Sequence, residues 1–155
     1  GRVFRIRPHV EKFDRFFLTY GDGLSSVPID RLLGFHLEKG KIATVTGVHP
    51  ATTFGIIREE GGIATAFAEK PRLDVLINGG FFVFERRVFE FLEDDGALEE
   101  KPLRRIADLR ELAVFRHEGF WQCMDDQKQV EALNAMWTRG DRPWMAWKLP
   151  RETRA

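Results

Sequence analysis

Residues 75–85, "VLINGGFFVFE", constrain the fold more than any other stretch of the chain. From Phe81 to Phe84 no polar residue interrupts the apolar run, although a half-exposed strand would place one at every second position. Strands without this alternation are typical of sheets that are covered on both faces. We therefore expect an α/β protein in which helices flank a central sheet.

The first third of the chain predicts a strand, a helix and a second strand. Residues 15–20 are apolar and aromatic, and residues 41–49 are rich in β-branched side chains. Between them lies a helical pattern, with signals for its start and end at Ser25, Ser26, Pro28 and Gly40. This order is that of a right-handed parallel crossover, so we expect parallel strands in the sheet.

The rest of the chain predicts both antiparallel and helical elements. Residues 54–71 indicate a hairpin that turns at Glu60, Gly61 and Gly62. Further along, we expect helices over 87–92, 98–109 and 126–139, and a strand over 111–121. No repeat or linker divides the sequence, so residues 1–155 are interpreted as a single domain with a mixed sheet.

Composition excludes several classes of function. Lys plus Arg and Asp plus Glu both number 24, a balance that argues against a nucleic-acid partner. Cys123 is the only cysteine, so no disulfide can form within the chain, which favours a reducing, cytoplasmic setting. No stretch approaches the ~18 consecutive apolar residues of a membrane span, so we expect no membrane partner.

Charged and glycine-rich clusters stand where the predicted strands end or break. In open α/β sheets, ligands bind outside the carboxyl ends of the strands. The clusters are Asp22 in "GDG", Glu69 and Lys70 in "AEKP", Asn78, Gly79 and Gly80 in "INGG", and Asp125 in "FWQCMD". We expect them to share one cleft.

The residue types in these clusters suit a phosphorylated ligand. Asp22 and Asp125 could hold one Mg²⁺ between them, because this ion takes one or two carboxylates and completes its shell with water and substrate phosphate. Lys70 could neutralise a phosphate group as a point charge. Magnesium is therefore the cofactor that the sequence predicts, and a phosphorylated ligand is the predicted partner.

Other residues of the clusters suit a ligand that carries hydroxyl groups. Glu69 and Asn78 could hydrogen-bond sugar hydroxyls, and the aromatic face of Trp121 could lie against a sugar ring. Gly79 and Gly80, which lack side chains, would let a ligand lie against the backbone. Together these features predict a sugar phosphate.

Each cluster also has a purely structural interpretation. An aspartate between glycines is a common turn, "EKP" is often a solvated strand end, and two glycines in a strand often form a bulge. Only the occurrence of all the clusters at strand ends favours a binding site.

Several other residues favour structural roles. Cys123 has no histidine near it in sequence and is predicted to be a buried thiol, and His36 is predicted to be a half-buried packing residue. Trp137, Trp144 and Trp147 are predicted to pack the C-terminal tail or a subunit interface.

Ordered segments over nearly the whole chain resemble the later part of the glucose-1-phosphate cytidylyltransferases, also called CDP-glucose pyrophosphorylases. The motifs "YGDG", "FAEKP" and "INGGFF" are similar to those of sugar-nucleotide pyrophosphorylases in general, whereas "RHEGFWQCMD" and "PWMAW" resemble the cytidylyl branch. Further segments that carry the resemblance are "HLEKGKIATVTGVHP", "FGII" and "LNAMWTRGD".

This resemblance implies a Rossmann-like nucleotide-diphospho-sugar transferase fold and a reaction. The phosphate of glucose 1-phosphate would attack the α-phosphorus of CTP in line, giving CDP-glucose and pyrophosphate. By motif, Asp22, Lys70 and Asp125 would be the catalytic residues, and the two aspartates would hold the metal. The implied substrate-binding residues are Tyr20, Gly21, Glu69, Asn78, Gly79 and Trp121.

The sequence also departs from the family pattern. No "GGxGTRL"-type loop precedes Arg15, so the resemblance predicts a chain truncated at its N-terminus that turns over only when the nucleotide-binding part is supplied. Asp126 stands where the family usually has threonine, and its carboxylate predicts added charge repulsion beside Asp125 unless a cation is bound. Thr53 stands where the family usually has arginine, and both changes argue against ordinary catalytic competence.

An alternative interpretation is a non-catalytic module, derived from the same scaffold, that binds sugar phosphate or serves in oligomeric assembly. Missing strands would leave a sheet edge and an apolar face uncovered. A homo-oligomer is therefore expected.

Overall fold

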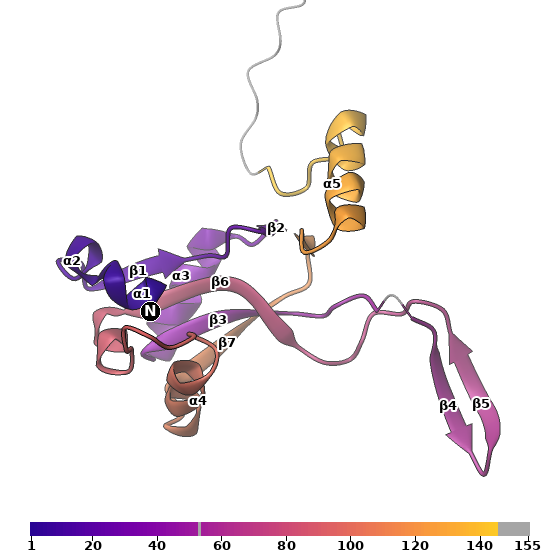
Figure 1. Ribbon diagram of the computed structural model, residues 1–155, viewed down its shortest axis with the longest axis horizontal. Helices are drawn as coiled ribbons and strands as arrows, with labels where there is room; N and C mark the ends of the chain where they lie inside the picture. Colours follow the sequence, from indigo (N-terminus) through magenta and orange to yellow (C-terminus); the bar gives the residue numbers. More distant parts are fainter. Residues whose placement is uncertain (53, 146–155) are drawn as a thin grey trace, which may run out of the picture.

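A four-stranded mixed sheet forms the centre of the molecule (Figure 1). The computed structural model describes residues 1–52 and 54–145. In spatial order the strands are β1 (Arg15–Leu18), β6 (Ile77–Glu85), β3 (Ala43–Val48) and β7 (Leu112–His117). The β6 strand is antiparallel to both β1 and β3, and β7 is parallel to β3. The predicted α/β class with a mixed sheet is confirmed.

The central strand β6 is buried on both faces, as its apolar run predicts. Phe82 and Phe84 pack into one core cluster with Ile106 of α4 (Lys101–Asp108). Val83, on the other face of the strand, packs with Leu32 of α3 (Ile29–Lys39). A short 3₁₀ helix, η1 (Arg86–Glu90), adds Val88 and Phe89 to the first cluster.

Strands β1 and β3 run in the same direction, because both are antiparallel to β6. The predicted strand–helix–strand order is thus present, but β6 lies between the two parallel strands. Helix α3 ends at Gly40, whose φ of 59° is left-handed, as predicted. Its N-cap is Pro28, however, so the prediction that Ser25 or Ser26 caps this helix is wrong.

The two serines instead hold a turn that follows strand β7. Ser25 Oγ donates a hydrogen bond to the carbonyl of Phe120 at 2.8 Å, and Ser26 Oγ accepts one from the Phe120 amide at 3.0 Å. His117 Nε2 lies 3.3 Å from the same Ser26 hydroxyl. These contacts fold the chain sharply after β7.

One strand was expected over residues 111–121, and this prediction is wrong. The chain leaves the main sheet after His117 and forms a separate short strand, β8 (Trp121–Cys123). This strand pairs antiparallel with β2 (Gly23–Ser25). The helix expected over 98–109 is shorter, because α4 begins at Lys101.

The predicted hairpin is formed by β4 (Ile56–Glu60) and β5 (Ile63–Ala68), and it extends away from the sheet (Figure 1). Gly61 and Gly62 form its turn with φ values of 59° and 83°. Every residue of both strands is exposed. The hairpin therefore makes little contact with the core.

Three further helices complete the described chain: α1 (Arg2–Arg5), α2 (Arg7–Val10) and α5 (Gln127–Arg139). The last was predicted, and it ends at Gly140 with a φ of 79°. Trp144 packs against Phe120 with ring centroids 5.4 Å apart, whereas Trp147 lies outside the described residues. Among residues 1–52 and 54–145, no helix has the length and apolar character needed to cross a membrane.

His36 is more buried than predicted, with 1% of its surface exposed. Its Nδ1 lies 2.8 Å from Thr44 Oγ1, and its Nε2 lies 3.0 Å from Glu85 Oε1. Burial raises the pKa of the Glu85 carboxyl, but hydrogen bonds from Arg15 and His36 outweigh it, so that pKa lies below its ordinary value. This polar network joins α3 and β1 to β6.

Candidate functional site

The pairing of β2 with β8 brings two distant aspartates to the same end of a short ribbon. Gly23 is paired with Cys123, and the Met124 amide donates a hydrogen bond to the Asp22 carbonyl at 2.9 Å. Asp22 directly precedes β2, and Asp125 follows the end of β8. The backbone therefore places Asp22 and Asp125 at the same end of the ribbon although they are far apart in sequence.

A cavity of about 540 Å³ opens at this end of the ribbon. Most of the sequence-predicted site residues line it, namely Tyr20, Asp22, Asn78, Gly79, Trp121 and Asp125. They come from the end of β1, from β6 and from the β2–β8 ribbon. The structure thus brings together three of the four predicted clusters.

The "INGG" segment forms a bulge in β6 beside this cavity. Val45 pairs with Phe82, and Gly47 pairs with Asn78. Between these pairs lies only Thr46 in β3, whereas β6 contributes residues 79–81. The bulge reorients the backbone, so the Gly79 carbonyl accepts a hydrogen bond from Trp121 Nε1 at 2.8 Å. The bulge that the structural interpretation of the two glycines predicts is therefore present in β6.

The missing side chains of Gly79 and Gly80 make room for protein atoms. A Cβ on Gly79 would lie 3.0 Å from the carbonyl oxygen of Thr46. A Cβ on Gly80 would lie 2.4 Å from the ring of Tyr20, and Gly80 also has a φ of 77°. The two glycines therefore allow close packing of the site, whereas the close approach of a ligand to them remains a prediction.

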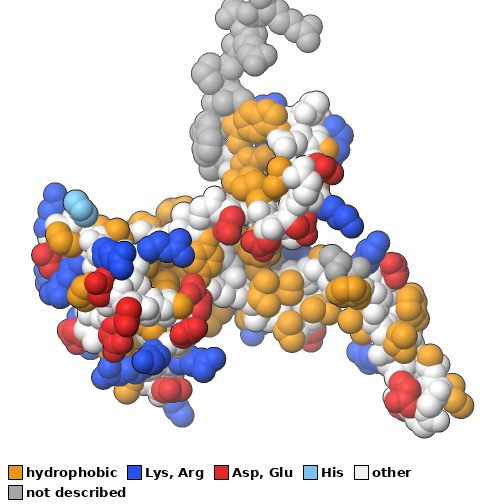
Figure 2. All heavy atoms as spheres, viewed as in Figure 1, with side chains coloured by type: hydrophobic (Ala, Val, Ile, Leu, Met, Phe, Trp, Pro, Cys, Tyr) orange, Lys and Arg blue, Asp and Glu red, His pale blue; other side chains and the backbone are white. Residues whose placement is uncertain are grey.

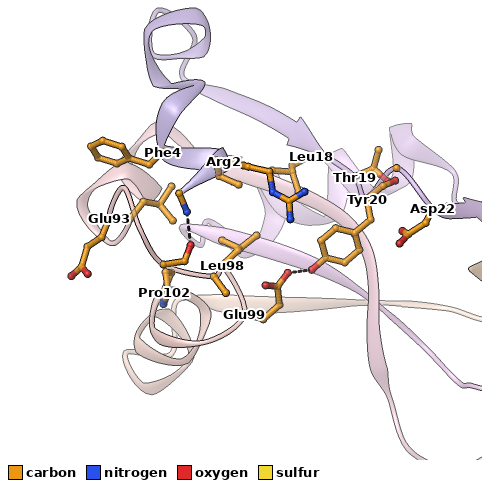
Figure 3. Close-up of a pocket in the computed structure, with 16 residues that line it drawn as sticks. Arg2, Phe4, Leu18, Thr19, Tyr20, Asp22, Glu93, Leu98, Glu99 and Pro102 are labelled. Atoms are coloured by element: carbon orange, nitrogen blue, oxygen red, sulfur yellow. Dashed lines mark hydrogen bonds between the residues drawn. The ribbon is translucent and has the colours of Figure 1, made fainter. Parts of the chain in front are cut away.

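Tyr20 and Asn78 are joined in a hydrogen-bond network. Asn78 Nδ2 donates to the Tyr20 hydroxyl at 2.8 Å, and Asn78 Oδ1 accepts from the Gly80 amide at 2.9 Å. The Tyr20 hydroxyl in turn donates to Glu99 (Figure 3). Burial first, and then this bond to Glu99, raise the pKa of Tyr20 well above its ordinary value. Tyr20 therefore stays protonated and orients the Asn78 amide.

The two aspartates fit a magnesium site with few protein ligands. Both side chains are exposed, so water and a substrate phosphate could complete the shell of a bound ion. Among the described residues, no cluster of three or more His, Cys, Asp and Glu side chains could hold a metal. A two-carboxylate site matches the donor set of Mg²⁺ but not that of zinc.

Asp126 has a structural role. Its Oδ1 accepts a hydrogen bond from the Gln129 amide at 2.8 Å and caps the N-terminus of α5. The Gln129 side chain closes the capping box, and its Oε1 also accepts from the Asp125 amide at 2.6 Å. The helix N-terminus stabilises negative charge, which reduces the repulsion expected beside Asp125.

Four predicted residues do not line this cavity, namely Gly21, Glu69, Lys70 and Gly80. Glu69 and Lys70 form an exposed ion pair at 3.6 Å beyond the end of β5, so their contacts with a ligand remain predictions. Gly21 lines a neighbouring cavity of about 360 Å³, which Tyr20 and Asp22 also border (Figure 3). Thr53 lies outside the described residues.

Cys123 borders the cavity but does not have the properties of a nucleophile. Its side chain is partly buried. Burial first, and then the nearby Asp125, raise the pKa of its thiol above the ordinary value. The predicted buried thiol is thus only half-buried, and its raised pKa disfavours the thiolate form that a nucleophile needs.

Two further residues that line the cavity, Arg72 and His49, were not predicted from the sequence. Arg72 carries a positive charge, and His49 has a titratable ring. His49 Nδ1 donates to the carbonyl of Leu73 at 2.9 Å, and Arg72 lies one residue before that carbonyl. Both residues come from connecting segments beside the hairpin. Lys70 and Pro71 belong to a recognisable motif, whereas Arg72 directly after them carries no motif signal.

Comparison with known proteins shows the family of this chain. Residues 3–148 match the nucleotidyl transferase family. The chain belongs to this family. A curated protein of Bacillus subtilis, named "Probable glucose-1-phosphate cytidylyltransferase", is 41% identical over 149 residues. The glucose-1-phosphate cytidylyltransferase of Salmonella typhi is 37% identical over 150 residues.

These matches cover 95% and 96% of the chain but 58% of each relative. Among solved structures, a "Putative Glucose-1-Phosphate Thymidylyltransferase" from Bacillus anthracis, in complex with sucrose, aligns with a TM-score of 0.65. It shares 14% identity, and the alignment covers 96% of this chain and 61% of that one. The fold of this nucleotidyl transferase chain is therefore the one that its sequence resemblance implied.

Proposed function

We propose that this chain supplies the sugar-phosphate-binding and magnesium-binding part of a nucleotidyltransferase that forms CDP-glucose and pyrophosphate from glucose 1-phosphate and CTP. The observation that carries the proposal is the cavity in which Asp22, Asn78, Trp121 and Asp125 meet. The names of the relatives that are 37–41% identical support the choice of glucose 1-phosphate and CTP.

In this proposal each residue has a distinct task. Asp22 and Asp125 hold Mg²⁺, which when bound offsets the negative charge of the reacting phosphates. Trp121 offers an indole face to the sugar, while its Nε1 is held by the Gly79 carbonyl. Asn78 keeps one N–H for a sugar hydroxyl after donating the other to Tyr20. Rate acceleration would then come from positioning and electrostatics.

We further propose that the 155 residues bind glucose 1-phosphate without turning it over. The sequence contains no "GGxGTRL"-type or other glycine-rich loop that could hold a nucleotide triphosphate. Turnover would then require a nucleotide-binding segment from elsewhere. This proposal separates binding of the sugar phosphate, which the cavity supports, from catalysis.

Isothermal titration calorimetry tests the proposal. We expect glucose 1-phosphate to release heat on binding when Mg²⁺ is present, and to bind much more weakly when EDTA removes the metal. After addition of CTP to the same sample, we expect no pyrophosphate release. Absence of binding with Mg²⁺ would refute the sugar-phosphate site, and pyrophosphate release would refute only the inference that turnover is lost.

We also propose that the chain assembles through the β4–β5 hairpin with a second copy of itself. Ile57 and Phe67 are paired across the hairpin and are 62% and 64% exposed. Figure 2 shows apolar side chains along this element. A lone two-stranded hairpin is only marginally stable, and within residues 1–52 and 54–145 no further strand pairs with either of its edges. A strand of another copy could pair there.

The assembly proposal predicts a change in mass for one surface variant. We expect sedimentation velocity to show a species larger than the monomer at micromolar concentration. Ile57→Lys should shift the protein toward monomer, because it places a charge on the proposed contact. Leu109→Lys changes a residue of similar exposure, 56%, at the end of α4 and should not alter the mass. A monomeric unmodified chain would refute this proposal.

A further inference from the structure

Arg72 is the one Lys or Arg side chain among the described residues that line the 540 Å³ cavity. The acidic residues there are Asp22 and Asp125. A sugar phosphate brings additional negative charge into a site that already holds two carboxylates. A metal held by these aspartates would offset part of that charge, and a cationic side chain in the cavity wall would offset more of it.

Backbone hydrogen bonds hold the segment that carries Arg72. The Thr52 amide donates to the Pro71 carbonyl at 3.2 Å, and the Leu73 amide donates to the Pro50 carbonyl at 3.0 Å. Between these two bonds, Arg72 and Ala51 form an antiparallel bridge. The base of this side chain therefore has a fixed position on the cavity wall, although its guanidinium is exposed.

The charge of Arg72 is available to a ligand. No ion pair of its guanidinium is found with any residue of the described ranges 1–52 and 54–145. Lys70 differs, because its Nζ lies 3.6 Å from Glu69 Oε1 and its side chain does not line the cavity. A guanidinium also offers two parallel N–H donors to a phosphate, which an ammonium does not.

From these observations we infer that Arg72 binds the phosphate group of the sugar 1-phosphate and thereby selects phosphorylated over unphosphorylated sugars. This inference rests on the proposed function, because it assigns a role within the same site. It places the phosphate between the guanidinium on the loop after the hairpin and the two aspartates on the β2–β8 ribbon. Trp121 and Asn78 then face the sugar.

Calorimetry on matched variants tests this assignment. Arg72→Gln should raise the dissociation constant for glucose 1-phosphate in the presence of Mg²⁺ by about tenfold or more, because it removes a charge-assisted hydrogen bond. Arg72→Lys should recover part of the affinity through its charge. Arg87→Gln removes the same charge from an exposed position on η1 and should leave binding unchanged.

Salt dependence gives a second readout that a purely structural role would not change. Binding of glucose 1-phosphate by the unmodified chain should weaken as ionic strength rises. Binding by the Arg72→Gln variant should weaken less steeply over the same range of ionic strength. Equal affinity of the unmodified chain and Arg72→Gln would overturn the inference while leaving the proposed function in place. A larger loss in Lys70→Gln than in Arg72→Gln would overturn it as well. Failure of the unmodified chain to bind would refute the proposed function itself.

Discussion

Asp22→Asn should abolish the magnesium dependence of glucose 1-phosphate binding and weaken that binding by about 100-fold or more in the presence of the metal. Asn keeps the size of the side chain and removes its charge, so the turn before β2 is preserved. The backbone bond from the Met124 amide to the Asp22 carbonyl does not involve the altered group. Any loss of binding then reports on the carboxylate.

The matched control for this experiment is Asp126→Asn. Asp126 is also an exposed aspartate next to the cavity, but its carboxylate caps α5. Asn is as good an N-cap as Asp, so this variant should fold normally and bind sugar phosphate as the unmodified chain does. Calorimetry at several Mg²⁺ concentrations would compare the two variants. If Asp22→Asn kept a metal-dependent affinity like that of the control, the proposed metal site would be wrong.

Local sequence patterns predicted most of the fold. Three of the signals depend only on residues that are close in sequence. They are the uninterrupted apolar run of β6, the glycines of the β4–β5 turn and Gly40 at the end of α3. Such signals depend on backbone conformation and on burial, both of which short segments encode. The elements they indicated are present in the structure.

The sequence did not predict the short ribbon of β2 and β8, on which the candidate site depends. Each strand is three residues long, and neither has a period or a turn signal of its own. The ribbon exists because Ser25 and Ser26 bind the backbone of Phe120, residues that are more than 90 positions apart. Side-chain hydrogen bonds over such separations leave no local pattern, whereas two serines shortly before Pro28 match the local pattern of a helix start.

The sequence therefore predicts several residues of the candidate site but not how they are arranged in space. Motifs indicate Asp22, Asn78 and Asp125, but they equally indicate Lys70, which does not line the cavity. Arg72, which does line it, is positioned by its bridge to Ala51. That bridge forms only because the two ends of the hairpin segment meet, a long-range consequence of the pairing of β4 with β5.

Gly80→Ala should reduce both stability and ligand binding, because two separate constraints act at this position. An alanine with a φ of 77° is strained by about 1–3 kcal/mol. Its Cβ would also lie 2.4 Å from Tyr20 Cδ2, and relieving such an overlap in packed surroundings typically costs about 1–3 kcal/mol more. We therefore expect a loss of about 3 kcal/mol in the free energy of unfolding, measured by urea denaturation.

Gly62→Ala separates the two constraints. Gly62 has a φ of 83° in the hairpin turn, and apart from Gly62 and its two chain neighbours no described residue has an atom within 4 Å of the position that an added Cβ would take. The free energy of unfolding of Gly62→Ala should therefore fall only by the cost of the backbone strain. In Gly80→Ala, displacement of Tyr20 would also break its hydrogen bond with Asn78, so affinity for glucose 1-phosphate should fall together with stability. Equal stability losses in the two variants, with unchanged affinity, would show that the bulge in β6 does not position the site.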